Sequence, residues 1–147
     1  MEQGIFVEID HTADLGLELS GSTPGAILEA AQRGLIALLL GDTSDLVPHT
    51  ERRIAITAAG YPDLLKAWCE RLYRLLEEEG FVALATHVEN AEPAECRAVV
   101  EGALPPAERV LEACELKAVT YHQLAFAAGN PDAAGNRRWA ARVIFDV

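Results

Sequence analysis

The chain has 147 residues, with 23 acidic and 12 basic side chains and a formal net charge of −11. This length suits one domain covering residues 1–147, and such a domain buries enough surface to fold without disulfides or a structural metal. The negative charge argues against strong direct binding of nucleic acid, because phosphate contacts supply most of that affinity. An acidic chain can approach a basic protein surface, although the same charge also serves solubility alone.

The composition also excludes several kinds of site and location. No stretch approaches the roughly 18 uninterrupted apolar residues of a membrane helix, and the first four residues lack the features of a signal peptide. We therefore expect a cytoplasmic protein without membrane contact. Cys69, Cys96 and Cys114 form no CxxC pair, so neither a zinc site nor a redox motif is indicated. Cys69 lies among apolar positions of a predicted helix and is expected to be a small buried residue.

Two short strands are predicted at the start of the chain. Residues 5–9 are rich in β-branched and aromatic side chains, which favour strands. Leu15, Leu17 and Leu19 then alternate with polar or small residues, and this period of two is typical of a strand with one buried face. A polar segment, residues 10–14, separates the two strands.

Two amphipathic helices are predicted next. Thr23 and Pro24 favour a helix start, because threonine caps free N–H groups and proline suits the first helical position. Gly41 is a natural stop for this helix. The second helix begins at residues 61–63 (Tyr-Pro-Asp) and ends before Gly80. Apolar residues three and four positions apart give each helix one buried stripe.

The other segments are predicted to be strands. One spans residues 53–58, between the helices, and four follow the second helix at residues 81–88, 96–102, 116–126 and 139–147. Turn-forming residues at 129–136 should join the last two as antiparallel neighbours. Strands and helices do not alternate regularly. We therefore expect an α+β fold, in which two amphipathic helices pack on one face of a mostly antiparallel β-sheet.

Two aspartates are candidates for a metal site. Asp14 ends the first polar segment and Asp146 is next to last in the chain, and aspartate is disfavoured in strands. Two carboxylates brought together repel unless a cation lies between them, and Ca²⁺, Mg²⁺ or Mn²⁺ would fit oxygen ligands. Lys117 could neutralise one acid instead, or as well. Nothing in the spacing shows that these residues meet, and a turn residue and an exposed terminal acid are the ordinary alternatives.

His11 is a further candidate, as a metal ligand or a base. A lone histidine beside a turn more often has a structural hydrogen bond. A serine or cysteine nucleophile with its base cannot be assembled from the sequence, and no glycine-rich phosphate-binding motif is present. The candidate chemistry therefore rests on the aspartates, Lys117 and His11.

Four segments, taken in order, resemble the archease family. They are residues 10–16 (Asp-His-Thr-Ala-Asp-Leu-Gly), 64–81, 117–122 (Lys-Ala-Val-Thr-Tyr-His) and 135–147. Each motif alone is weak evidence for the family, but four motifs in this order are specific to it. The resemblance runs nearly end to end, and about residues 84–112 carry little of it.

The resemblance implies a compact antiparallel sheet with two helices, and a non-enzymatic activator of the RtcB-type RNA ligase that joins RNA ends in tRNA splicing and repair. Such an activator promotes guanylylation of the ligase and its multiple turnover. The family's metal site carries over onto Asp14 and Asp146, and its motif lysine onto Lys117, with His11 beside them. We expect the ion to be Ca²⁺, with Mg²⁺ and Mn²⁺ as alternatives.

Two other functions stay open at this point. One is a chaperone-like modulator of a tRNA methyltransferase, which is an older proposal for the family. The other is a metal-dependent phosphodiester hydrolase that uses the same acids. Exposed sheet edges would also allow a homo-oligomer.

Overall fold

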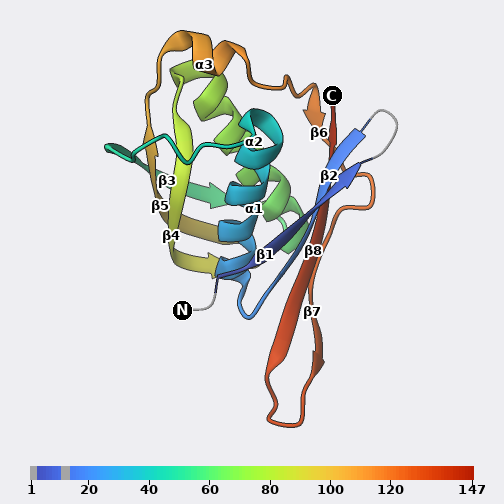
Figure 1. Ribbon diagram of the computed structural model, residues 1–147. Helices are drawn as coiled ribbons and strands as arrows, with labels where there is room; N and C mark the ends of the chain where they lie inside the picture. The colour runs from blue at the N-terminus through green and yellow to red at the C-terminus, as the bar shows by residue number, and fades with distance from the viewer. Residues whose placement is uncertain (1–2, 11–13) are drawn as a thin grey trace.

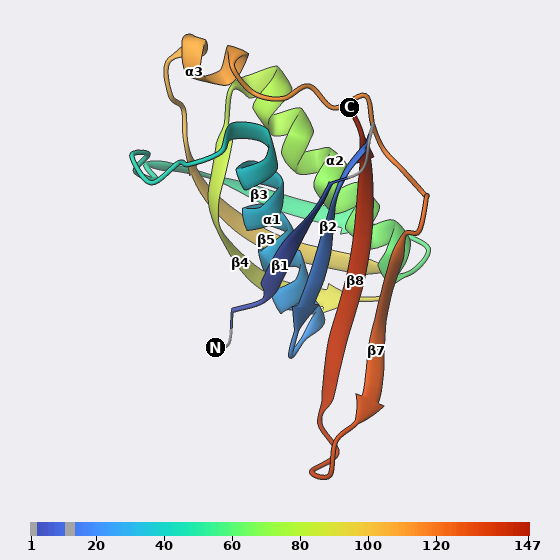
Figure 2. The same ribbon diagram turned by 45° about the vertical axis from the view of Figure 1, so that its right-hand side comes forward.

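The computed structural model describes residues 3–10 and 14–147. Helices α1 (Pro24–Leu40) and α2 (Tyr61–Glu79) lie between two antiparallel sheets (Figures 1 and 2). The first sheet contains β1 (Ile5–Asp10), β2 (Asp14–Gly21), β6 (Ala118–Val119), β7 (Ala125–Pro131) and β8 (Arg137–Asp146). The second contains β3 (Thr50–Thr57), β4 (Val82–Glu92) and β5 (Glu95–Ala103). A short helix, α3 (Ala107–Leu111), follows β5.

The expected α+β class with antiparallel strands is confirmed. The first sheet has the order β1-β2-β8-β6, with β7 also paired to β8, and the second has the order β3-β5-β4. The strands thus form two sheets where the sequence predicted one, and the helices contact both. Periodicity shows which face of a strand is buried, but it does not show which strand lies beside it.

The helix ends agree with the predicted caps. The Thr23 hydroxyl accepts a hydrogen bond from the Ala26 N–H at 3.0 Å, and Pro24 follows at the first helical position. Gly80 ends α2 in the left-handed conformation, with φ of 67°, which a residue with a Cβ adopts at a cost. Within the described residues, no helix has the length and apolarity needed to cross a membrane.

The single strand predicted for residues 116–126 is wrong. The segment breaks into β6 and β7, which both pair with β8. Between them Thr120 uses its N–H and its hydroxyl to donate to the same Ile144 carbonyl, each at 3.0 Å. Gln123 has a φ of 53° in the turn that follows. The threonine hydroxyl thus competes with the hydrogen bonds between the strands for a backbone acceptor, and the chain leaves the sheet at this residue.

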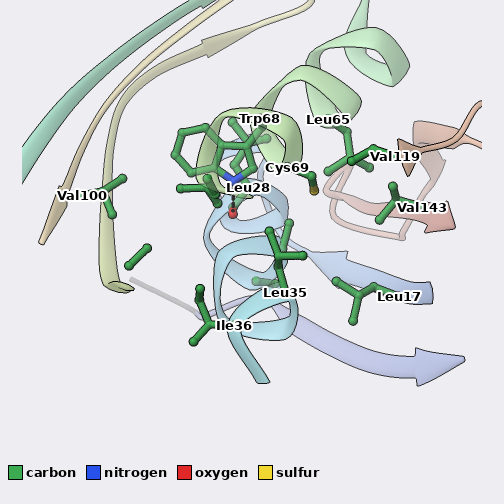
Figure 3. Packing of buried hydrophobic residues seen from close by; sticks show 14 of the residues in the cluster. Leu17, Leu28, Leu35, Ile36, Leu65, Trp68, Cys69, Val100, Val119 and Val143 are labelled. Carbon is green, nitrogen blue, oxygen red and sulfur yellow. Dashed lines mark hydrogen bonds between the residues drawn. The ribbon is translucent and has the colours of Figure 1, made fainter. Parts of the chain in front are cut away.

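The core connects the layers through Trp68 of α2. Its indole N–H donates to the Leu28 carbonyl of α1 at 2.9 Å, and its ring is fully buried (Figure 3). Leu17 and Val143 contribute from the first sheet, and Val100 contributes from the second. One continuous apolar cluster therefore holds both sheets and both helices together.

The cysteines differ in accessibility, which gives a first testable prediction. Cys69 and Cys96 are buried, whereas Cys114 is partly exposed. Burial raises the pKa of the Cys69 thiol to about 12 and also raises the pKa of Cys96. Since the thiolate is the reactive form, a thiol reagent at mildly alkaline pH should label Cys114 rapidly. The other two should react only after denaturation. A Cys114→Ser variant should lose the rapid phase, and rapid labelling of Cys69 would contradict the buried core.

Candidate functional site

The structure places Asp14 and Asp146 directly opposite each other on neighbouring strands. The β2–β8 register pairs them at the end of the first sheet. Directly opposed residues of antiparallel strands have Cβ atoms roughly 4.5–5.5 Å apart, on the same face. Two acids from opposite ends of the sequence thus lie side by side.

The two aspartates lie on the sheet face that points away from the helices. Leu17 and Leu19 of β2 are buried in the core, as is Phe145 of β8. Side chains alternate between faces along a strand, so Asp14 and Asp146 belong to the opposite, outer face. Each is half-buried. This placement leaves the carboxylates open to another molecule.

An apolar floor formed by Ile144, which was not predicted from the sequence, lies next to this pair. Gly16 and Ile144 are paired in the register, and Ile144 is 1% exposed. A Cβ on Gly16 would lie 2.7 Å from the Ile144 Cδ1 atom, so the glycine leaves the space that Ile144 occupies. The available signal was a glycine inside a strand pattern, which often marks a close approach. The carboxylates therefore stand beside a buried apolar side chain, where water is partly excluded.

On the outer face, the charges of one cross-strand pair neutralise each other, whereas those of the aspartate pair do not. Glu18 and Arg142, directly opposed on β2 and β8, form an ion pair, and Arg142 also donates to the Gln123 side chain at 2.8 Å. Within residues 3–10 and 14–147, no ion pair or side-chain hydrogen bond involves the carboxylate of Asp14 or Asp146. Two like charges therefore stand together with no described cation between them, a disfavoured arrangement in a sheet.

Lys117 is held beside the pair through its backbone. Its N–H donates to the Asp146 carbonyl at 2.8 Å, and the next residue, Ala118, is paired with Asp146 in the β6–β8 register. The lysine is exposed, and in the described part of the chain its ammonium group makes no ion pair. Lys117, the third candidate residue, thus lies at the same end of the sheet as the two aspartates, and no described acid neutralises its charge.

The sequence model of the archease protein family (MTH1598/TM1083) matches residues 6–147. The chain belongs to the archease family. It is 29% identical to protein archease of Methanosarcina mazei over 143 residues, which cover 95% of this chain and 93% of the relative. It is 27% identical to protein archease of Methanopyrus kandleri, covering 95% and 97% of the two chains.

Two solved structures have the same architecture. The solution structure of Methanobacterium thermoautotrophicum protein 1598 aligns over 100% of both chains, with a TM-score of 0.73 and 25% identity. The crystal structure of an archease from Thermotoga maritima, described as a possible chaperone, covers 95% of this chain and 94% of its own. Its TM-score is 0.59 at 22% identity, which supports the fold alone.

The pair of carboxylates suits a hard divalent cation. Carboxylate oxygens are the ligands that Ca²⁺, Mg²⁺ and Mn²⁺ prefer, and a cation between Asp14 and Asp146 would offset their repulsion. Among the described residues, no group of three or more His, Cys, Asp or Glu side chains is placed to hold a metal. His11, the remaining candidate, lies outside the described residues. The two carboxylates would thus provide part of a coordination shell, which water or a partner would complete.

This arrangement predicts a small gain in stability when one acid is neutralised. Without divalent ions, Asp146→Asn should raise the free energy of unfolding by about 0.2–1 kcal/mol, because it removes a cross-strand like-charge contact. Added Ca²⁺, Mg²⁺ or Mn²⁺ should stabilise the wild type and leave the variant nearly unchanged. Thermal unfolding in chelator and in millimolar cation measures both effects. A variant stabilised by the cation as strongly as the wild type would contradict the site.

Proposed function

We propose that this member of the archease family activates an RtcB-type RNA ligase. In this proposal the end of the first sheet that carries Asp14, Asp146 and Lys117 docks at the mouth of the ligase active site. The observation that carries it is the β2–β8 register, which sets the two aspartates opposite each other, with Lys117 bonded to the same strand end. The activator itself catalyses no reaction and acts in the cytoplasm.

Each residue has a distinct role in the proposal. Asp14 and Asp146 would hold a divalent ion, Ca²⁺ first and Mg²⁺ or Mn²⁺ as alternatives, and that ion would supply positive charge near the nucleotide phosphates during guanylylation. Lys117 carries a second positive charge, and its exposed side chain is free to reach a phosphate or a ligase carboxylate. The apolar floor formed by Ile144 limits water on one side of the carboxylates.

The position of the site favours an activator over a hydrolase. The carboxylates are half-buried on a sheet face turned away from the helices, and their coordination can be completed from outside. The net charge of −11 supports docking on a basic surface, such as the phosphate-binding mouth of a nucleic-acid enzyme. A coordination shell completed by a second protein is consistent with a chain that activates another enzyme.

The test is ligation by the RtcB-type enzyme of the same organism, with and without this chain. We expect faster guanylylation of the ligase and repeated turnover in the presence of the chain. Unchanged ligase kinetics would overturn the proposal. Cleavage of a phosphodiester by the chain alone with Mn²⁺ would instead indicate the hydrolase. Binding to a tRNA methyltransferase that is indifferent to Asp146→Asn would indicate the chaperone, the role that the description of the Thermotoga maritima relative names.

A further inference from the structure

We infer that the open edge of β3 and the adjoining side of α2 form a groove that binds an extended, acidic segment of a partner protein as an added β-strand. The groove belongs to the second sheet, whereas Asp14 and Asp146 lie on the first. The inference therefore does not depend on the proposed metal site.

The backbone of β3 has an unused side. In the described residues β3 pairs only with β5, through eight successive residue pairs without a bulge. The Ala58 N–H donates to the Ala94 carbonyl at 2.8 Å, just beyond this ladder. Successive residues of an edge strand face the partner and the open side in turn. The N–H and carbonyl groups of Arg53, Ala55 and Thr57 therefore face away from β5.

The opposite edge of this sheet differs, because its ladder is interrupted and one of its carbonyl groups is occupied. The β4–β5 register shifts twice, between Ala83 and Ala85 and between Val88 and Asn90. The buried Gln32 of α1 donates to the Ala83 carbonyl at 3.0 Å, so a side chain occupies a backbone acceptor there. Bulges and covering side chains are the usual means of protecting a sheet edge. The regular edge of β3 lacks both protections along Arg53–Thr57.

The space beside this edge has the shape of a strand-binding groove. Two hollows, of about 250 and 290 Å³, follow β3 from Arg52 to Thr57, and Arg71 and Arg74 of α2 line both. A strand that adds to a sheet edge makes main-chain hydrogen bonds, while neighbouring pockets receive alternate side chains. The groove thus offers a line of backbone groups on one wall, and on the other Arg71 and Arg74 beside Glu70, Glu78 and Glu79.

Charge identifies the occupant as acidic. Of the acids in the lining, Glu79 is neutralised by Arg52 at 2.9 Å and Glu70 by Lys66 at 3.0 Å, while Glu78 has no described ion pair. Arg71 and Arg74 make no ion pair or side-chain hydrogen bond with any described residue. Two unpaired guanidinium groups in a chain of net charge −11 favour carboxylates spaced along an extended peptide, which arginine binds in a bidentate manner.

The test uses a fluorescent, end-blocked peptide of alternating Glu and Thr, with a Lys-Thr peptide and a backbone N-methylated Glu-Thr peptide as controls. Only the Glu-Thr peptide should bind, and it should shift the NMR signals of the Arg53, Ala55 and Thr57 amides. The double variant Arg71→Glu with Arg74→Glu should weaken binding by about tenfold or more, because two exposed ion pairs become repulsive. The control Arg137→Glu, a single charge reversal on the β7–β8 hairpin, should bind as the wild type does.

Three results would overturn the inference. One is the absence of binding and of amide shifts at millimolar peptide, and another is equal affinity in the double variant. The third is occupation of the same edge by a different molecule. Shifts of these amides by single-stranded RNA but not by the peptide would assign the groove to nucleic acid. Shifts that grow with protein concentration alone would assign it to a second copy of the chain.

Discussion

Asp14→Asn and Asp146→Asn are each expected to abolish activation of the cognate ligase while the fold is preserved. The two carboxylates are directly opposed and have no described cation of their own, so in the proposed site each would depend on the other to bind an ion. The loss should be at least about tenfold in the rate of guanylylation, since changing even a residue that supports a metal ligand typically costs 10–100-fold. Guanylylation and multiple-turnover ligation measure the effect, and circular dichroism checks the fold.

Glu18→Gln is the matched control for these variants. Glu18 lies on the same outer face and the same strand as Asp14, but Arg142 already neutralises it. Its replacement should leave activation unchanged, which separates loss of the site from loss of surface charge. Lys117→Met should reduce activation without altering cation binding, because Lys117 is bonded to Asp146 through its backbone only. Wild-type activation by both aspartate variants would remove the assignment of the site.

The helices could be predicted from the sequence because their determinants are local. Thr23, Pro24 and Gly41 define the ends of α1 through capping and backbone preferences that act within a few residues. The division into two sheets could not be predicted in this way. The partner of β3 is β5, and one of the two partners of β2 is β8, which lies more than a hundred positions from β2. Long-range pairing depends on how whole layers fit together, and no short pattern records it.

The candidate site, like the fold, could be predicted from the sequence only in part. Alternation in β2 puts Leu17 in the core, whereas Val143, Ile144 and Phe145 of β8 are consecutive apolar residues that are all buried. Once these strands are neighbours, the parity of the pattern sends Asp14 and Asp146 to the same face, because a slip of one residue would expose the core positions. The residue types and the buried face of β2 were therefore readable from the sequence, whereas the face of Asp146 was not. The meeting of the two aspartates was not, since it requires the register between the chain ends.

Replacing Trp68 by alanine is expected to destabilise the protein by about 3–5 kcal/mol, the range for truncating a large buried aromatic residue. The indole is fully buried between the sheets and donates to the Leu28 carbonyl at 2.9 Å (Figure 3). Alanine would leave a cavity that rigid neighbours on α1 and β5 could fill only in part. This loss is a large share of the about 5–15 kcal/mol that stabilises a typical domain. Urea denaturation, followed by circular dichroism, gives the change in free energy.

Trp68→Phe separates the cavity from the hydrogen bond. Phenylalanine keeps most of the buried volume but cannot donate to the Leu28 carbonyl, so it should cost less than alanine does. The Leu28 carbonyl lies within α1 and can still accept a bond from the helix. The remaining cost should therefore come mainly from imperfect packing, within about 1–3 kcal/mol. If Trp68→Ala were no more damaging than Trp68→Phe, the layers could not depend on this side chain to pack against each other, and the central place of Trp68 in the core would be wrong.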